Sequence, residues 1–451
     1  MKGSKMNKIY AFDRVYNKIF NIILSHKTFF ILLVFTSTPI ITFLLSLLGS
    51  NKNPLEFTLI ITIILFAIYF NIIFAKRNYK IAIVLVFVLS FVLKMFIASQ
   101  LFGTYDMESF YIVADIMKEG VTTNIYAETD RYNYSPIWSY VLYLNYYLSR
   151  ATSIALSTVI KFSLIIFDIF TAILLYKINE NSNKGEKERF IVVASFLYSP
   201  ITIMVSSYGA QFENIALYFL LLYIYIGRKR QYIWHHLLYG LSIAVKQVTI
   251  LPIAFLTLRQ KGTKIILFLI LAAIPFTILI TPYLSEGLPR ILNNVIGYAG
   301  TPGFWGYSRA IRYVTLTLGL YKLEIIFTFL MLKIMTVVMF AIMFYYFNKY
   351  SKINLLNGII ISYLLFYTLA PGFGAQYLVW ILPFAVLRHN HFYYVYSLLG
   401  SLVVFFFYYG HGTGDLFIRE VLAFSLVGPL LWVFCIYWLF RHHLEVKKDN
   451  M

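Results

Sequence analysis

The amino-acid sequence predicts an all-α polytopic membrane protein, and three observations lead to this class. Of the 451 residues, 60% are apolar, 19% are aromatic and only 13% are charged, which lies outside the range of soluble globular domains. Long apolar runs divide the chain into segments of a length that crosses a bilayer. Most Lys and Arg residues fall in short tracts between these segments, as the positive-inside rule describes. We therefore expect one helical bundle with about 14 transmembrane segments.

The expected segments follow from the apolar runs and from placing the basic tracts in the cytoplasm. They are residues 28–49, 55–75, 80–100, 154–176, 190–206, 212–227, 232–246, 247–258, 265–283, 325–347, 354–370, 376–387, 392–409 and 420–440. An even number of crossings places both termini in the cytoplasm. The segments 232–246, 247–258 and 376–387 are shorter than the roughly 20 residues that a spanning helix needs. We expect these three to line a cavity rather than to face lipid.

The same assignment divides the chain into five parts. They are an interfacial amphipathic N-terminus (1–27), two additional N-terminal segments (28–79), a core module (80–285), a second outer loop (286–324), and a C-terminal bundle with a basic tail (325–451). The net charge of +19 comes mainly from the cytoplasmic tracts, so we predict no nucleic-acid partner. The single cysteine, Cys435, excludes an intrachain disulfide.

The outer loop 101–153 is the main polar interruption of the core module, and we expect two juxtamembrane helices in it. Residues 106–119 carry an apolar stripe at helical spacing and end at Gly120. The stripe consists of Phe110, Val113, Ile116 and Met117. Residues 136–149 could form a short span, but a crossing there would move the basic tract 177–189 to the outer side. We therefore expect a second helix on the outer membrane surface.

Short polar motifs recur at the outer ends of the expected segments. They are Asp106, Tyr132-Asn133-Tyr134-Ser135-Pro136, Tyr208-Gly209-Ala210-Gln211-Phe212-Glu213-Asn214, Lys246-Gln247 before Pro252, and Phe373-Gly374-Ala375-Gln376-Tyr377. In order and sidedness these motifs resemble the GT-C superfamily of glycosyltransferases, most closely glycosyltransferase family 87 and its mannosyltransferase relatives. The resemblance covers residues 80–390. Two features depart from the family pattern: the two segments that precede it, and Ser135, where many relatives carry proline.

The resemblance implies a GT-C-type bundle that uses a polyprenyl-phosphate-linked sugar. We expect transfer of a hexose, mannose or glucose, to a lipid-linked or cell-envelope glycan acceptor on the extracytoplasmic side of the plasma membrane. The expected partners of the protein are thus a polyprenyl-phosphate sugar donor, a glycan or glycolipid acceptor and membrane lipids. The competing class is a non-enzymatic transporter or flippase of a polyprenyl-linked lipid. Transporters place their polar determinants near the bilayer midplane, whereas the polar motifs here gather at helix ends, so we favour the enzyme.

Asp106 is the candidate catalytic base of an inverting displacement, because a carboxylate at the mouth of an apolar bundle can deprotonate a sugar hydroxyl. Its alternative role is a helix N-cap. Glu108 could accept a hydrogen bond from the sugar, or it could be a solvated acid in the first helical turn. Together the two acids could hold a divalent ion. We expect no required cofactor or metal, since Asp-x-Glu is a common spacing.

The candidate phosphate-binding residues are Lys246, Arg309 and Arg312. Lys246 could act as a point charge for a phosphate or could extend toward outer water. Arg309 and Arg312 share one helical face and could clamp a phosphate or contact lipid headgroups. Within the apolar segments, we expect Lys161 and Asp168 to pair, because a seven-residue offset returns to one helical face.

The candidate sugar-binding residues are polar or aromatic side chains of the outer turns. They are Tyr134, Gln211, Glu213, Asn214, Gln247, Trp305, Gln376, Tyr377 and His411. A turn or a helix cap would explain Asn214 equally well. A flexible surface loop would likewise account for His411.

Overall fold

Helices form nearly all of the regular structure in this protein. The computed structural model describes residues 78–450 apart from positions 183, 230–232, 299, 351 and 389. The expected amphipathic N-terminus and the segments 28–49 and 55–75 lie outside the described residues. Everything below concerns the compact unit that begins at Tyr79.

Six of the described helices are long and apolar enough to cross a membrane. They are Tyr79–Gln100, Leu156–Glu180, Glu186–Tyr208, Lys264–Ile296, His391–Gly412 and Phe417–Lys448. Two shorter apolar helices, Gln247–Leu258 and Ala375–Arg388, coincide closely with the expected short segments 247–258 and 376–387. A third, Leu355–Leu369, lies within the expected segment 354–370. The protein is therefore an all-α integral membrane protein. The total of 14 segments stays a prediction.

The elements in the first part of the unit include the helices of the loop 101–153. They are α4 (Tyr79–Gln100), α5 (Tyr105–Met117), α6 (Ile125–Glu128), α7 (Pro136–Thr152), α8 (Leu156–Glu180), α9 (Glu186–Leu197), α10 (Pro200–Thr202), the π-helical turn η1 (Ile203–Tyr208), α11 (Glu213–Lys229), α12 (His235–Val245), the 3-10 turn η2 (Gln247–Ile250) and α13 (Ile253–Leu258).

The later elements are again almost all helical. They are α14 (Lys264–Ile280), η3 (Thr281–Tyr283), α15 (Leu284–Arg290), η4 (Ile291–Ile296), β1 (Thr301–Pro302), α16 (Gly306–Thr317), α17 (Tyr321–Lys349), α18 (Leu355–Leu369), β2 (Gly372–Phe373), η5 (Ala375–Val379), α19 (Leu382–Arg388), α20 (His391–Thr413), η6 (Phe417–Val427) and α21 (Gly428–Asn450). Helical structure continues from α14 to Ile296, so the segment 286–324 begins as a helix. The short antiparallel pair β1 and β2 joins this loop to the motif at Phe373.

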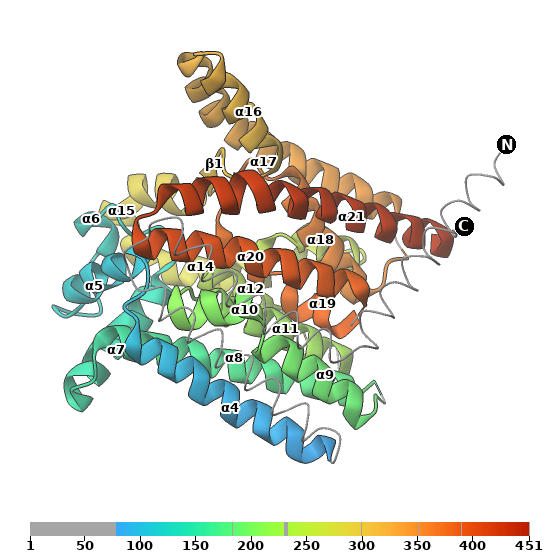
Figure 1. The fold of residues 1–451 in the computed structure, drawn as a ribbon, viewed down its shortest axis with the longest axis horizontal. Coiled ribbons are helices and arrows are strands. Elements are labelled where there is room, and N and C mark those ends of the chain that lie inside the picture. Colours follow the sequence, from blue (N-terminus) through green and yellow to red (C-terminus); the bar gives the residue numbers. More distant parts are fainter. Residues whose placement is uncertain are drawn as a thin grey trace. The chain divides into compact units, whose positions relative to one another are not determined.

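Both helices expected in the loop 101–153 are present as α5 and α7. Pro136 begins α7, where proline is favoured because its missing N–H has no helical partner. The rings of Phe110 on α5 and Trp138 on α7 meet edge to face, with their centroids 5.1 Å apart. Figure 1 shows α5, α6, α7 and α15 gathered at one end of the bundle. The side of the membrane on which this end lies stays a prediction.

One expected contact inside the bundle was wrong. Asp168 on α8 forms an ion pair with Lys94 on α4, and both side chains are fully buried. Lys161 instead donates to the carbonyl oxygen of Leu101 at 2.5 Å. Helical spacing placed Lys161 and Asp168 on one face of α8. The packing of α4 against α8 then supplied Asp168 with a basic partner from another helix.

Candidate active site

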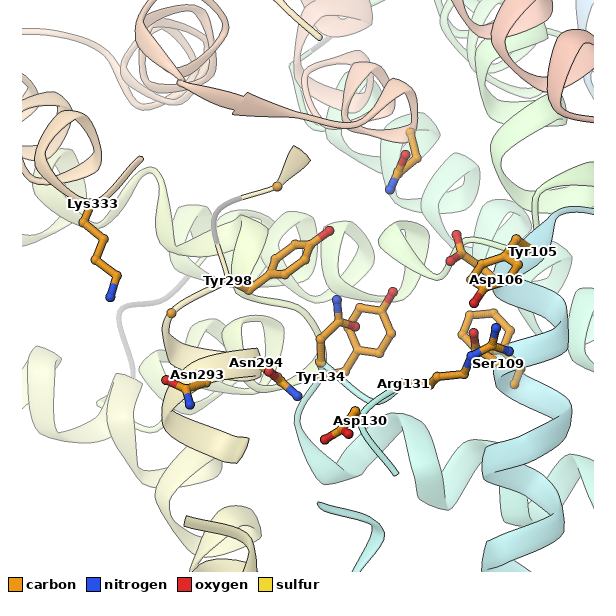
Figure 2. A pocket seen from close by; sticks show the side chains of 15 residues that line it. Tyr105, Asp106, Ser109, Asp130, Arg131, Tyr134, Asn293, Asn294, Tyr298 and Lys333 are labelled. Carbon is orange, nitrogen blue, oxygen red and sulfur yellow. The ribbon is translucent and has the colours of Figure 1, made fainter. Parts of the chain in front are cut away.

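Asp106 lines a cavity of about 450 Å³ at the end of the bundle formed by α5 and its neighbours. The wall of the cavity comes from α5, the segment 130–134, the segment 293–300, α17 and Gln376. Figure 2 shows the side chains of Asp106, Tyr134 and Tyr298 facing this space from different elements. A second cavity of about 290 Å³ shares Tyr105, Asp106, Tyr298 and Gln376 with the first. Asp106 therefore lies where two cavities meet.

The N-cap alternative for Asp106 is not observed. Thr104 is the N-cap of α5, and Asp106 is the second residue of the helix. The Asp106 carboxylate is half-buried, and Gln211 Nε2 donates to its Oδ2 at 2.5 Å. Among the described residues, no Lys or Arg forms an ion pair with Asp106. Asp106 is thus a carboxylate available to a ligand rather than half of a salt bridge. It also lies in the first turn of a helix, a position that suits acidic side chains.

A tight turn between η1 and α11 carries Gln211 to Asp106. Ala210 has a φ of 55°, a left-handed conformation that is uncommon for residues other than glycine. The turn also lies close to the connection before α5, because a Cβ on Gly103 would come within 2.7 Å of the Tyr208 carbonyl oxygen. A glycine is therefore required at position 103, where φ is 113°. This close approach brings two segments distant in sequence to the same site.

Glu213 and Lys246 form a buried ion pair beside this turn. Lys246 Nζ lies 2.7 Å from Glu213 Oε1, and the Glu213 side chain is fully buried. The same ammonium group lies 4.4 Å from the centroid of the Phe212 ring and 5.1 Å from that of Tyr134. The neighbours of the Lys246 ammonium group are therefore a carboxylate and two aromatic rings. Lys246 is not among the residues that line either cavity.

The two arginines expected to bind phosphate also lie outside both cavities. Arg309 binds the Glu420 carboxylate at 3.3 Å and donates to the Ser425 hydroxyl at 2.8 Å. Burial lowers the pKa of the Arg309 guanidinium, and the neighbouring Glu420 carboxylate offsets part of this lowering. Arg312 lies over the Phe304 ring, 5.1 Å from its centroid. These contacts tie α16 to η6 and to the preceding loop.

Two other cations line the larger cavity, and the sequence argument missed both as site residues. The Arg131 guanidinium lies over the Tyr105 ring, 4.3 Å from its centroid. Lys333 enters from α17, as Figure 2 shows. Neither side chain forms an ion pair within the described part of the chain. A lysine inside a long apolar helix was a signal for Lys333, and the signal for Arg131 was its place directly before the motif that begins at Tyr132.

Neutral hydrogen-bonding groups complete the wall of the larger cavity. Carboxamides are both donors and acceptors, which suits sugar hydroxyl groups. They come from Asn133, Asn293, Asn294 and Gln376. Burial, assisted by the charge of Asp106, raises the pKa of the Tyr134 and Tyr298 phenols. Both phenols are therefore neutral at physiological pH and can donate to a bound ligand.

Several other predicted site residues have packing roles. Gln247 Nε2 donates to the carbonyl oxygens of Asn133 at 3.3 Å and Val295 at 3.0 Å, so it ties together two segments that line the cavity. Trp305 is buried, donates to the Tyr367 carbonyl at 2.7 Å and stacks on the ring of Phe373.

The remaining predicted residues are divided between the site and its surroundings. The Tyr377 hydroxyl is 3.4 Å from that of Tyr298, directly behind the cavity wall. His411 lines the smaller cavity. Glu108 is exposed and lines neither cavity, and Asn214 donates to Asp168 inside the bundle. No group of three His, Cys, Asp or Glu side chains suited to a metal ion occurs in the described ranges.

Comparison with known proteins gives a partial similarity to a mannosyltransferase. The chain is 28% identical over 138 residues to GPI mannosyltransferase 1 of Kluyveromyces lactis. The match covers 30% of this chain and 32% of that protein. No known family model matches the chain. The similarity thus agrees with the mannosyltransferase resemblance of the motifs over about a third of the relative's length.

Proposed function

We propose that this protein is a membrane glycosyltransferase that transfers a hexose, mannose or glucose, from a polyprenyl-phosphate donor to a glycan or glycolipid acceptor. The observation that carries the proposal is Asp106, a carboxylate at the junction of two cavities that forms no ion pair with any residue the structure describes. The partial similarity to a mannosyltransferase supports the same reaction class.

In the proposed reaction Asp106 is the general base of a single inverting displacement. Gln211 occupies Oδ2 of the carboxylate, so Oδ1 remains for the proton of the acceptor hydroxyl. As that proton moves to Asp106, the acceptor oxygen forms a bond to the anomeric carbon, and the bond from this carbon to the phosphate oxygen breaks. The phosphate leaves with the bonding electrons. Positive charge near this oxygen stabilises the departing group.

We assign the positive charge to Arg131 and Lys333 rather than to Lys246, Arg309 and Arg312. Arg131 and Lys333 line the cavity, whereas the other three cations have partners elsewhere. Arg131 is beside Tyr105, the residue before Asp106, and it is therefore the candidate for the leaving phosphate. The carboxamides of the same wall are suited to bind sugar hydroxyl groups.

The proposal includes an orientation in the membrane. In this orientation both termini are cytoplasmic and the Asp106 cavity is extracytoplasmic, which the basic tracts between the segments support. Accessibility of single introduced cysteines to a membrane-impermeant reagent in intact cells tests this orientation. Labelling at Thr129 and protection at Lys261 are expected, and the reverse pattern would contradict it.

A transporter or flippase of a polyprenyl-linked lipid is the second candidate. It is favoured by one observation, the fully buried Lys94–Asp168 pair within the apolar helices, since ionisable groups at membrane depth often mark transport pathways. Proteoliposomes loaded with a fluorescent polyprenyl-phosphate sugar separate the two functions. Translocation without glycosyl transfer would favour the transporter.

The decisive experiment is an assay of the purified protein with synthetic polyprenyl-phosphate mannose and glucose and a panel of glycan and glycolipid acceptors. Wild type is compared with Asp106→Asn, which keeps the shape of the side chain and removes the base. Asp115→Asn is the matched control, since Asp115 is on the same helix, is exposed and pairs with Lys118. Transfer by wild type and Asp115→Asn, and its loss in Asp106→Asn, are expected. Unchanged transfer by Asp106→Asn would overturn the proposal, as would the absence of transfer by wild type.

A further inference from the structure

The turn that presents Gln211 to Asp106 has an unusual backbone. It begins in the π-helical turn η1, in which hydrogen bonds span one more residue than in an α-helix. The amide of Gly209 donates to Met204 at 2.8 Å, and the amide of Gln211 donates to Val205 at 2.9 Å. Ala210 between them is left-handed. A backbone of this kind persists only where surrounding contacts hold it in place.

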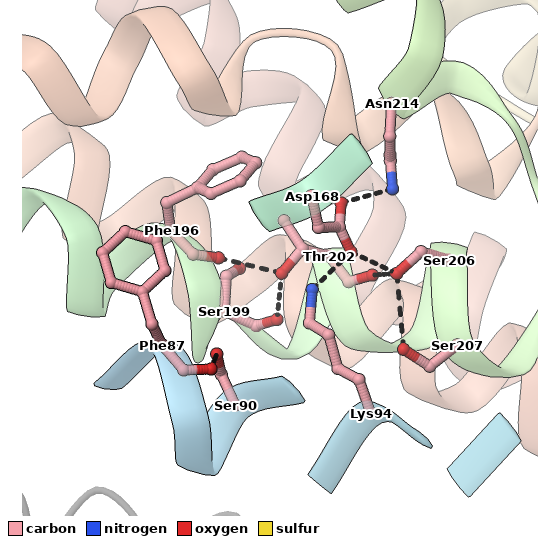
Figure 3. Close-up of polar contacts among 10 residues, drawn as sticks. All are labelled: Phe87, Ser90, Lys94, Asp168, Phe196, Ser199, Thr202, Ser206, Ser207 and Asn214. Carbon is pink, nitrogen blue, oxygen red and sulfur yellow. Dashed lines mark hydrogen bonds and ion pairs between the residues drawn. The ribbon is translucent and has the colours of Figure 1, made fainter. Parts of the chain in front are cut away.

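A buried polar network contacts this turn on both sides. Figure 3 shows Asp168 at its centre. Oδ2 of Asp168 accepts a hydrogen bond from the Ser206 hydroxyl at 2.6 Å, just before the turn. Its Oδ1 accepts one from the Asn214 amide, just after the turn. Lys94 forms an ion pair with the same carboxylate, and every member of the network is buried.

We propose that Asp168 is a positioning residue for glycosyl transfer, because it fixes both ends of the turn and thereby holds Gln211 against Asp106. This inference rests on the proposed function, in which Asp106 is the base. Asp168 lines neither cavity and would act only through Ser206, Asn214 and the turn between them. Lys94 supplies a basic partner that offsets part of the cost of burying the Asp168 carboxyl group inside an apolar bundle.

Net stability alone is a weak reason for this network. Replacing a buried ion pair by apolar side chains of similar volume is often neutral or stabilising. A carboxylate with two oxygens, however, can accept hydrogen bonds from two separate segments at once, which no apolar side chain can do. The network therefore determines a geometry rather than simply filling space. The geometry that it determines is that of the segment carrying Gln211.

Two double variants separate positioning from folding. Lys94→Met with Asp168→Leu removes both charges and the hydrogen bonds from Ser206 and Asn214 to Asp168, and it leaves neither partner of the pair as an unpaired buried charge. Lys94→Met with Asp168→Asn also removes both charges but keeps an oxygen that can accept from Asn214. Thr171→Val is a matched control, since Thr171 is buried on the same helix and its hydroxyl forms no hydrogen bond to any described residue.

The first readout is kinetic and is normalised to folded protein measured by size exclusion. The leucine double variant is expected to lose roughly 10- to 100-fold in kcat, the scale of a misplaced catalytic contact, with little change in KM. The asparagine double variant should recover most of this loss. Adding Gln211→Ala to the leucine double variant should cause no further loss, because both changes break the same contact. The inference would be overturned if Gln211→Ala lowered the kcat of the leucine double variant as much as it lowers that of wild type. Equal activity of the two double variants would overturn it as well.

The second readout needs no substrate, so it stands even if the proposed reaction fails. Hydrogen–deuterium exchange of the peptide covering residues 203–214 is compared among the same variants. Faster exchange in the leucine double variant than in the asparagine double variant and in Thr171→Val is expected. Equal exchange in all variants would show that Asp168 does not hold the turn.

Discussion

Asp106 and Asp168 are two aspartates in one bundle, and their surroundings differ in every respect that matters for chemistry. Asp168 is fully buried, pairs with Lys94 and accepts further hydrogen bonds from Ser206 and Asn214. Asp106 is half-buried, accepts a hydrogen bond from Gln211 alone among the described side chains, and opens into two cavities. A carboxylate whose oxygens are saturated supports structure, whereas one with an unoccupied oxygen beside a cavity can take a proton. The predictions below test this division.

The largest expected effect is on catalysis. Asp106→Asn should lower kcat by about 10²- to 10⁴-fold, the range that general-base catalysis contributes. Its unfolding temperature should stay close to that of wild type, because no ion pair is broken. Glycosyl transfer and thermal unfolding of the same purified sample give both quantities. A large drop in unfolding temperature would place Asp106 with Asp168 among the structural carboxylates.

At Asp168 a large loss of stability is expected in addition to the loss of positioning. Asp168→Ala alone leaves the Lys94 ammonium buried without its partner, which typically costs about 3–5 kcal/mol. Denaturant unfolding of the purified protein in detergent measures this loss. Adding Lys94→Met to Asp168→Ala should restore much of the stability, since the unpaired charge is then gone. A destabilisation below about 1 kcal/mol for the single variant would mean that water or a rearranged partner reaches Lys94.

Local periodicity was enough to predict the helices that position Asp106. The apolar stripe of residues 106–119 and the proline at position 136 correspond to α5 and α7. The meeting of Asp106 with the Gln211 turn could be expected only from the order of the motifs. These features depend on residues close in sequence or on a family pattern.

Contacts between distant segments could not be predicted in the same way. Lys246 is neutralised by Glu213 and Arg309 by Glu420, and neither pairing follows from spacing or sidedness. Sidedness alone placed all the outer cations near one recess. In the folded chain, packing directs Lys246 and Arg309 to acidic partners outside the cavity. Arg131, which lines the cavity, comes from a loop without periodicity.

A smaller effect is expected from the cations of the cavity. A hydrogen bond to a charged group contributes about 1.5–3 kcal/mol, so Arg131→Gln and Lys333→Gln should each lower kcat/KM by roughly 10- to 100-fold. If Arg131 binds the leaving phosphate, its variant should lose mainly kcat. Lys118→Gln, on the surface of the same loop, is the control and should leave transfer unchanged. Equal activity of Arg131→Gln and wild type would remove Arg131 from the site.

The smallest expected effect is that of a chelator. Successive residues of an α-helix turn by about 100°, so Asp106 and Glu108 project from α5 roughly 200° apart and do not converge on one ion. Glu108 is exposed in agreement with this geometry, whereas Asp106 faces the cavities. Excess EDTA should therefore change the transfer rate by less than about twofold, and added Mg²⁺ or Mn²⁺ should not raise it. A strict requirement for either ion would mean that the donor phosphate brings a metal to Asp106. The unoccupied oxygen that distinguishes Asp106 from Asp168 would then be a metal ligand rather than a proton acceptor.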